Sequence, residues 1–161
     1  MTYYQSVKKF REVYKTWEFK KTKVQRKVHP EAKLMESVEN ASNLTTGLLV
    51  SGWVVEKQPN AYIIYQHYWN VTKQGSHYDI TPIHEMKDRQ YYYDSTIYDY
   101  TKHVYPTGYP SFAVVEDGLF VLPTGTMPLG GEVILEDFYP FIPDSHNMQF
   151  TAEILRETEG I

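Results

Sequence analysis

The chain has 161 residues, contains no cysteine and carries a formal net charge of −4 at pH 7. This length fits one domain with a sizeable core, and the missing cysteines exclude disulfides, thiolate metal sites and a cysteine nucleophile. No apolar run approaches the roughly 18 residues of a transmembrane helix, and the first residues lack the apolar segment of a secretory signal. We therefore expect a cytoplasmic protein that does not enter a membrane.

Charge and tyrosine are unevenly distributed along the chain. Residues 1–28 hold nine Lys or Arg against two Glu, a net of +7, whereas residues 29–161 hold seven against eighteen acidic residues, a net of −11. Two interpretations stay open: a basic helix lying on an acidic domain, or an arm for nucleic acid or an acidic partner. The 15 tyrosines favour β-structure and argue against disorder.

The N-terminal segment, residues 1–28, predicts a basic helical arm. Between residue 3 and about residue 27 the pattern fits one helix or two, because one apolar stripe recurs at helical spacing; it consists of Val7, Phe10, Val13, Tyr14 and Trp17. Pro30 suits the first position of a second helix over residues 31–35. Ser37 predicts the beginning of a further helix, which should end before Gly47.

After Gly47 the pattern changes from helical to extended. Segments 48–56, 61–72 and 77–81 are rich in Val, Ile, Tyr and Trp and are separated by turns at 59–60 and 74–75, which predicts an antiparallel meander. Strands are also expected at 90–93, in a hairpin over 112–122, and at 132–138. Helices followed by strands are typical of the α+β class, so we expect N-terminal helices packed on an antiparallel sheet. The predicted single domain, 1–161, comprises the arm 1–28, a core 30–82 and a tyrosine-rich β extension 83–161.

Three residues have the chemistry and the order of a catalytic triad. Ser37 lies at the predicted start of a helix, where the helix dipole favours developing negative charge, and His67 and Asp79 lie on successive predicted strands. A histidine can take the proton of a nucleophile, and an aspartate can hold the imidazole in the required tautomer. Each residue also has a structural interpretation: a helix cap, a packed histidine and a turn former, respectively.

The register of the two strands decides whether His67 and Asp79 meet, because residues directly opposite in an antiparallel pair share a face. A two-residue turn at 74–75 would set His67 opposite Pro82 and direct Asp79 to the other face. A three-residue turn centred on Gln74 would set His67 opposite Thr81, with Asp79 on the same face and about 7 Å away. Periodicity leaves both registers open.

Four short pieces around these residues resemble the transglutaminase-like members of the papain-like cysteine hydrolases. Such proteins look like Cys-x-x-Asn-Ala, then a glycine-rich strand, then His-x-Trp-Asn and Asp-x-Thr. The matching pieces here, in order, are Glu39-Asn40-Ala41, Gly52-Trp53, His67-x-Trp69-Asn70 and Asp79-x-Thr81. The resemblance covers residues 30–82. It implies a papain-like fold and hydrolysis or transfer at an amide or acyl group of a peptide, protein or small molecule.

The resemblance implies that the residue at position 37 is the nucleophile, His67 the general base and then acid, and Asp79 its orienting partner. Where the family has cysteine, however, this chain has Ser37. Three explanations stay open: an engineered inactive variant, a natural serine enzyme, and a pseudoenzyme. We expect an enzyme, and the rival is a non-catalytic inhibitor or binding protein that captures a protein or small ligand in the same cleft.

Two other functions have weaker support in the sequence. A small cluster could bind zinc or iron, but its spacing matches no strong motif, so we expect neither metal nor cofactor; it consists of His67, His77, Asp79 and His84. The tyrosines between 91 and 109 could stack bases, but the neighbouring aspartates repel a phosphate backbone, so we do not expect a nucleic-acid partner. These tyrosines also suit a protein interface. The sequence leaves the oligomeric state open.

Overall fold

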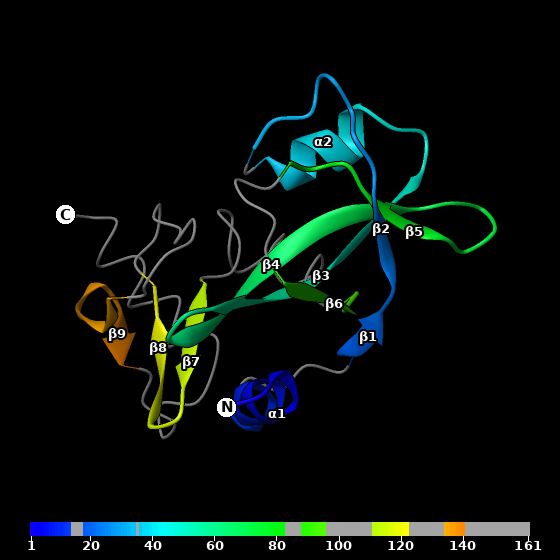
Figure 1. The fold of residues 1–161 in the computed structure, drawn as a ribbon. Coiled ribbons are helices and arrows are strands. Elements are labelled where there is room, and N and C mark those ends of the chain that lie inside the picture. Colours follow the sequence, from blue (N-terminus) through cyan, green and yellow to red (C-terminus); the bar gives the residue numbers. More distant parts are fainter. Residues whose placement is uncertain (14–17, 35, 83–87, 96–110, 123–133, 141–161) are drawn as a thin grey trace.

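The computed structural model describes residues 1–13, 18–34, 36–82, 88–95, 111–122 and 134–140. These residues form a mixed fold of helices and one nine-stranded sheet, in which every strand pair but one is antiparallel. In Figure 1 the first helix lies below the central hairpin of the sheet and the second lies above it. Within the described ranges no helix is long and apolar enough to span a membrane.

The helices are α1 (Tyr3–Val13), α2 (Ser37–Asn43) and the short 3-10 helix η1 (Leu135–Asp137). The strands are β1 (Lys20–Thr22), β2 (Val24–Arg26), β3 (Leu48–Gln58), β4 (Ala61–Val71), β5 (His77–Asp79), β6 (Arg89–Tyr93), β7 (Phe112–Val115), β8 (Gly118–Val121) and β9 (Tyr139–Pro140). The sheet order is β1-β6-β3-β4-β7-β8-β9, and β5 pairs with β4 on one side and with β2 on the other.

The hairpin of β3 and β4 is the centre of the sheet. Each strand has eleven residues, many of them β-branched or aromatic, and the turn at 59–60 closes a ladder that runs from Gln58↔Ala61 to Leu48↔Val71. Most side chains of β4 are buried on both faces, which explains its nearly continuous apolar sequence. The predicted strands 48–56 and 61–72 are therefore confirmed.

Alternation along these strands divides the buried side chains into two clusters, one on each face. The first contains Trp53, Val55, Tyr62 and Ile64, on which Phe10 of α1 packs. The second contains Val54, Ile63, Tyr65, Trp69 and Tyr91. Residue 67 lies two positions from 65 and from 69 and so shares their face, which places the imidazole of His67 on the second face.

The basic arm differs from the prediction. Phe10 is buried, and Val7 and Val13 pack against the core as expected, but α1 ends at Val13 and the predicted helix to residue 27 is wrong. Segments 20–22 and 24–26 are strands that pair with β6 and β5. From residue 21 to residue 27 the side chains are alternately exposed and half-buried, as in a strand with one face toward the core. The many Lys and Arg residues hid this alternation in the sequence. Tyr14 and Trp17 lie outside the described residues.

Other predicted elements have mixed outcomes. Pro30 opens a turn, and no helix forms over the described residues 31–34. The helix predicted at Ser37 is confirmed but ends at Asn43. The strand at 90–93 and the hairpin at 112–122 are confirmed as β6 and as β7–β8, whereas the predicted strand 132–138 is replaced, where described, by η1 and β9. The remainder of the 83–161 extension lies outside the described residues.

Candidate functional site

The register of β4 and β5 brings His67 and Asp79 onto one face. Asn70 pairs with Tyr78 and Val71 with His77, so the hairpin is centred on residue 74. Gly75 makes the turn possible because its φ of 88° is in the left-handed region. Of the two registers considered, this is the three-residue turn, and His67 Nε2 lies 2.8 Å from Asp79 Oδ2.

Asp79 is buried and receives four hydrogen bonds. Its Oδ2 accepts from His67, from Arg26 Nη1 at 2.7 Å and from the Tyr91 hydroxyl at 2.5 Å, and its Oδ1 accepts from the Thr81 N–H at 3.0 Å. Burial raises the pKa of Asp79, but His67, Tyr91 and Arg26 together lower it more, so the pKa lies well below its usual range. Asp79 is therefore a carboxylate at neutral pH.

The ionised Asp79 fixes the tautomer of His67. A carboxylate only accepts hydrogen bonds, so His67 Nε2 carries the hydrogen, and in the neutral ring Nδ1 then holds the lone pair. Among the described residues Nδ1 has no hydrogen-bond partner, although the residue is only 6% exposed. The basic nitrogen of the site is thus Nδ1, the atom that points away from Asp79.

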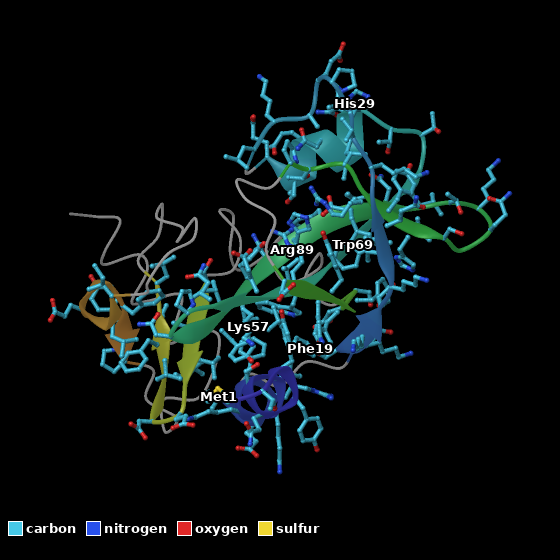
Figure 2. All side chains as sticks on the ribbon, in the orientation of Figure 1. Met1, Phe19, His29, Lys57, Trp69 and Arg89 are labelled. Atoms are coloured by element: carbon cyan, nitrogen blue, oxygen red, sulfur yellow. The ribbon has the colours of Figure 1, made fainter. Side chains whose placement is uncertain are left out.

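A second buried ion pair extends this network across the sheet. Arg89 Nη2 and the Tyr65 hydroxyl each lie 3.2 Å from Glu56 Oε2, and Arg89 Nη1 lies 3.4 Å from the Tyr91 hydroxyl. Burial and the nearby charge of Asp79 raise the pKa of Tyr91, so its hydroxyl keeps the hydrogen that it donates. In Figure 2 the side chains of Arg89 and Trp69 lie on the side of the hairpin where α2 lies.

The sequence interpretation missed Arg26, Tyr91, Glu56 and Arg89. A signal existed for two of them: Glu56 interrupts the apolar sequence of a central strand, and Arg26 occupies an inward position of the period-two segment. A charge at an inward strand position requires a buried partner, which predicts an ion pair. Which residues pair could not be derived, because their strands are far apart in the chain.

Asn40 connects the first turn of α2 to the His67–Asp79 pair. Its side chain exchanges two hydrogen bonds with the backbone of Lys33, at 2.7 and 3.0 Å, and Nδ2 also lies 3.1 Å from Thr81 Oγ1. Because the backbone N–H of Thr81 donates to Asp79, Thr81 links α2 to the carboxylate through two separate hydrogen bonds. Asn40 therefore holds the helix against the end of β5.

Asn70 anchors α2 from the other side. Its Nδ2 donates to the carbonyl of Ala41 at 2.8 Å and to that of Gly47 at 3.2 Å, and the side chain is fully buried. The structure uses Asn70 to fix the helix.

Ser37 is the first residue of α2 but not its cap. The N-cap position belongs to Glu36, and no side chain caps the helix. The Ser37 side chain is half-buried and forms no hydrogen bond with His67 or Asp79 in the described part of the chain. The structure thus joins two of the three predicted residues directly, and the nucleophilic role of Ser37 stays a prediction.

Gly52 and Trp69, two further residues of the resemblance, shape the surroundings of His67. Gly52 pairs with His67 across the hairpin, and a Cβ there would collide with the Trp69 indole and the Tyr92 carbonyl oxygen. The Trp69 ring stacks beside that of His67, with centroids 6.3 Å apart, and its Nε1 donates to His77 Nδ1 at 2.9 Å. Only glycine lets the indole lie this close to the strand.

Acid should break the contact between Trp69 and His77. Burial lowers the pKa of His77, and protonation of Nδ1 would remove the acceptor of the indole N–H. As the pH falls, the unfolded state therefore binds this proton at a higher pH than the folded state does. The free energy of unfolding should decrease below the unfolded pKa of about 6.5. We expect a change of tryptophan fluorescence below about pH 6.5. The change should vanish in His77→Gln and persist in His29→Gln; an identical titration in His77→Gln would contradict this interpretation.

Comparison with known proteins gives no matching family model, no similar curated protein and no similar solved structure. The resemblance therefore depends on the motif residues alone. Among the described residues no group of three or more His, Asp or Glu is arranged to hold a metal ion. His84, a member of the cluster considered for zinc or iron, lies outside those residues.

Proposed function

We propose that this protein has an acyl-transfer site of the transglutaminase-like, papain-like kind, with His67 as general base, Asp79 as its orienting partner and position 37 as the nucleophile. The observation that carries the proposal is the buried His67–Asp79 pair, joined at 2.8 Å. An imidazole that is held by a carboxylate through one nitrogen, with the other nitrogen unpartnered among the described residues, has the orientation that a general base needs.

The order of the elements also supports the proposal. Helix α2 begins at Ser37 and is followed by β3, by β4 with His67 and by β5 with Asp79. The resemblance implies this same order, in which the nucleophile opens a helix and the base and its partner lie on successive antiparallel strands. The two hydrogen bonds of Thr81, one with Asn40 and one with Asp79, link the helix to the carboxylate.

The proposed reaction follows from the tautomer of His67. Nδ1 would take the proton of the nucleophile at position 37 as that atom attacks a carbonyl carbon, and would return it to the leaving group. Asp79 would hold the ring through Nε2 and stabilise the imidazolium that forms. The substrate class is an amide or other acyl group of a peptide, protein or small molecule, and the reaction is hydrolysis or transfer.

One observation favours a second function, that of a pseudoenzyme or inhibitor. Ser37 lacks a hydrogen bond to His67, and a hydroxyl is far less acidic than a thiol, so Ser37 needs stronger activation than cysteine would. In this function the buried pair would hold a polar group of a protein or ligand without chemistry.

A thiol at position 37 tests the proposal. In Ser37→Cys, His67 as the proposed base should lower the thiol pKa below the free value of about 8.5, and alkylation by iodoacetamide at pH 6.5 should be about tenfold faster than that of a free thiol. Ser42→Cys, at an exposed position of the same helix, is the matched control and should react like a free thiol.

The role of His67 is tested in the same background. Adding His67→Gln to Ser37→Cys should return the alkylation rate to that of the Ser42→Cys control, because the base is lost. A Ser37→Cys thiol that reacts no faster than the control, and that is indifferent to His67, would contradict the catalytic proposal and favour the binding protein.

A further inference from the structure

We infer that Arg26 is a positioning residue that sets the charge balance of this site: its guanidinium neutralises Asp79 and so disfavours a second proton on the His67 ring. The inference deepens the proposed function and depends on it for its catalytic meaning. The charge state of His67 can be measured without any activity, however, so the two can fail separately.

Arg26 lies beside Asp79 and contacts it through its side chain. The two residues are directly opposite each other in the parallel pair of β2 and β5, and the Lys27 N–H donates to the Asp79 carbonyl at 2.9 Å. Arg26 Nη1 lies 2.7 Å from Asp79 Oδ2 and Nη2 donates to the Thr81 carbonyl. The oxygen that Arg26 contacts is the same one that accepts from His67.

The groups that face this pair come from every neighbouring strand. Tyr91 of β6 donates to Asp79, and Tyr65 and Trp69 of β4 flank the His67 ring as neutral aromatic groups. Beyond Trp69 lies the ring of His77. Farther along β3 and β6, Glu56 and Arg89 form a second ion pair, joined at 3.2 Å.

The described charges around His67 therefore cancel in pairs. Asp79 is balanced by Arg26, and Glu56 by Arg89. A proton on His67 would add a positive charge to a site whose described negative charges are already paired, which is unfavourable. Without Arg26, the described donors to Asp79 besides His67 would be the neutral Tyr91 hydroxyl and the Thr81 N–H, so a proton on Nδ1 would become more favourable. A protonated Nδ1 cannot act as the base.

NMR of the histidine rings in the full chain tests the inference. The His67 signal is assigned by its disappearance in His67→Gln. In Arg26→Gln we expect the midpoint of the His67 titration to move up by about one pH unit, because one opposing charge has been removed. Arg26→Met, uncharged and of similar length, should give the same shift and serves if Arg26→Gln does not fold.

Two control variants separate charge from other effects. Arg26→Lys keeps the positive charge and should hold the midpoint near that of the wild type. Lys27→Gln removes the same charge from the next residue, which is exposed to solvent and screened, and should leave the midpoint unchanged. A neutral Arg26 variant with an unchanged or lowered midpoint would overturn the inference, as would an equal shift in Lys27→Gln.

The proposed function has a separate readout in the thiol of Ser37→Cys. A raised midpoint in Arg26→Gln together with an unreactive thiol would support the charge inference and contradict the catalytic proposal. A reactive thiol together with an unchanged His67 midpoint would support the catalytic proposal and contradict the charge inference.

Discussion

Replacing Phe10 with alanine should lower the free energy of unfolding by about 3–5 kcal/mol, the usual cost of deleting a buried aromatic ring. Phe10 is fully buried, and its ring contacts those of Trp53 and Phe112, with centroids 5.1 and 5.3 Å apart. These rings belong to β3 and β7, so one side chain joins α1 to two strands of the central sheet. The close-packed aromatic neighbours cannot collapse into the cavity.

Chemical denaturation measures the effect, with Tyr4→Ala as the matched control. Tyr4 lies on the same helix but is 75% exposed, so its truncation should change stability by less than about 0.5 kcal/mol. If Phe10→Ala were as stable as the wild type, α1 would be an appendage instead of part of the core. The alternative interpretation of the basic segment, as an arm for nucleic acid, would then gain support.

The central hairpin and the His67–Asp79 pair could be predicted because both depend on local sequence. Strands β3 and β4 are long, rich in aromatic and β-branched residues, and joined by a short turn. The meeting of His67 with Asp79 follows from the register of one hairpin, which the residues around Gln74 determine. Two registers were compatible with the sequence, and the structure has the one that joins the pair.

The N-terminal strands and the partners of Asp79 could not be predicted, because they depend on distant pairing. Strands β1 and β2 have three residues each, too few for a strong local signal, and are stabilised by β6 and β5. Arg26 is 53 residues from Asp79 in the chain, so no local pattern could match them. The wrong helix prediction for the N-terminal segment and the omission of Arg26 therefore have the same cause: both depend on pairing with residues distant in the chain.

Replacing Asp79 with alanine should destabilise the protein by about 3–5 kcal/mol, as expected when one partner of a buried ion pair is removed. The Arg26 guanidinium, the His67 Nε2–H and the Tyr91 hydroxyl would all lose their acceptor. Asp79→Asn keeps the shape and one acceptor oxygen, so its loss should be smaller. Asp117→Ala, in the exposed turn between β7 and β8, is the control and should leave stability unchanged.

The effect of Asp79 should depend on pH in a defined direction. Its pKa in the folded protein lies well below the unfolded value of about 3.9, so its contribution to stability is complete above that value and is lost as the pH falls below it. The wild type and Asp79→Asn should therefore differ more in their free energy of unfolding at pH 7 than at about pH 3, as measured by chemical denaturation. Equal stability at pH 7 would mean that the cost of burying the carboxylate cancels its hydrogen bonds. In that case the pair would orient His67 without stabilising the fold, and a function at the base would be the remaining physical reason for a buried carboxylate at this position.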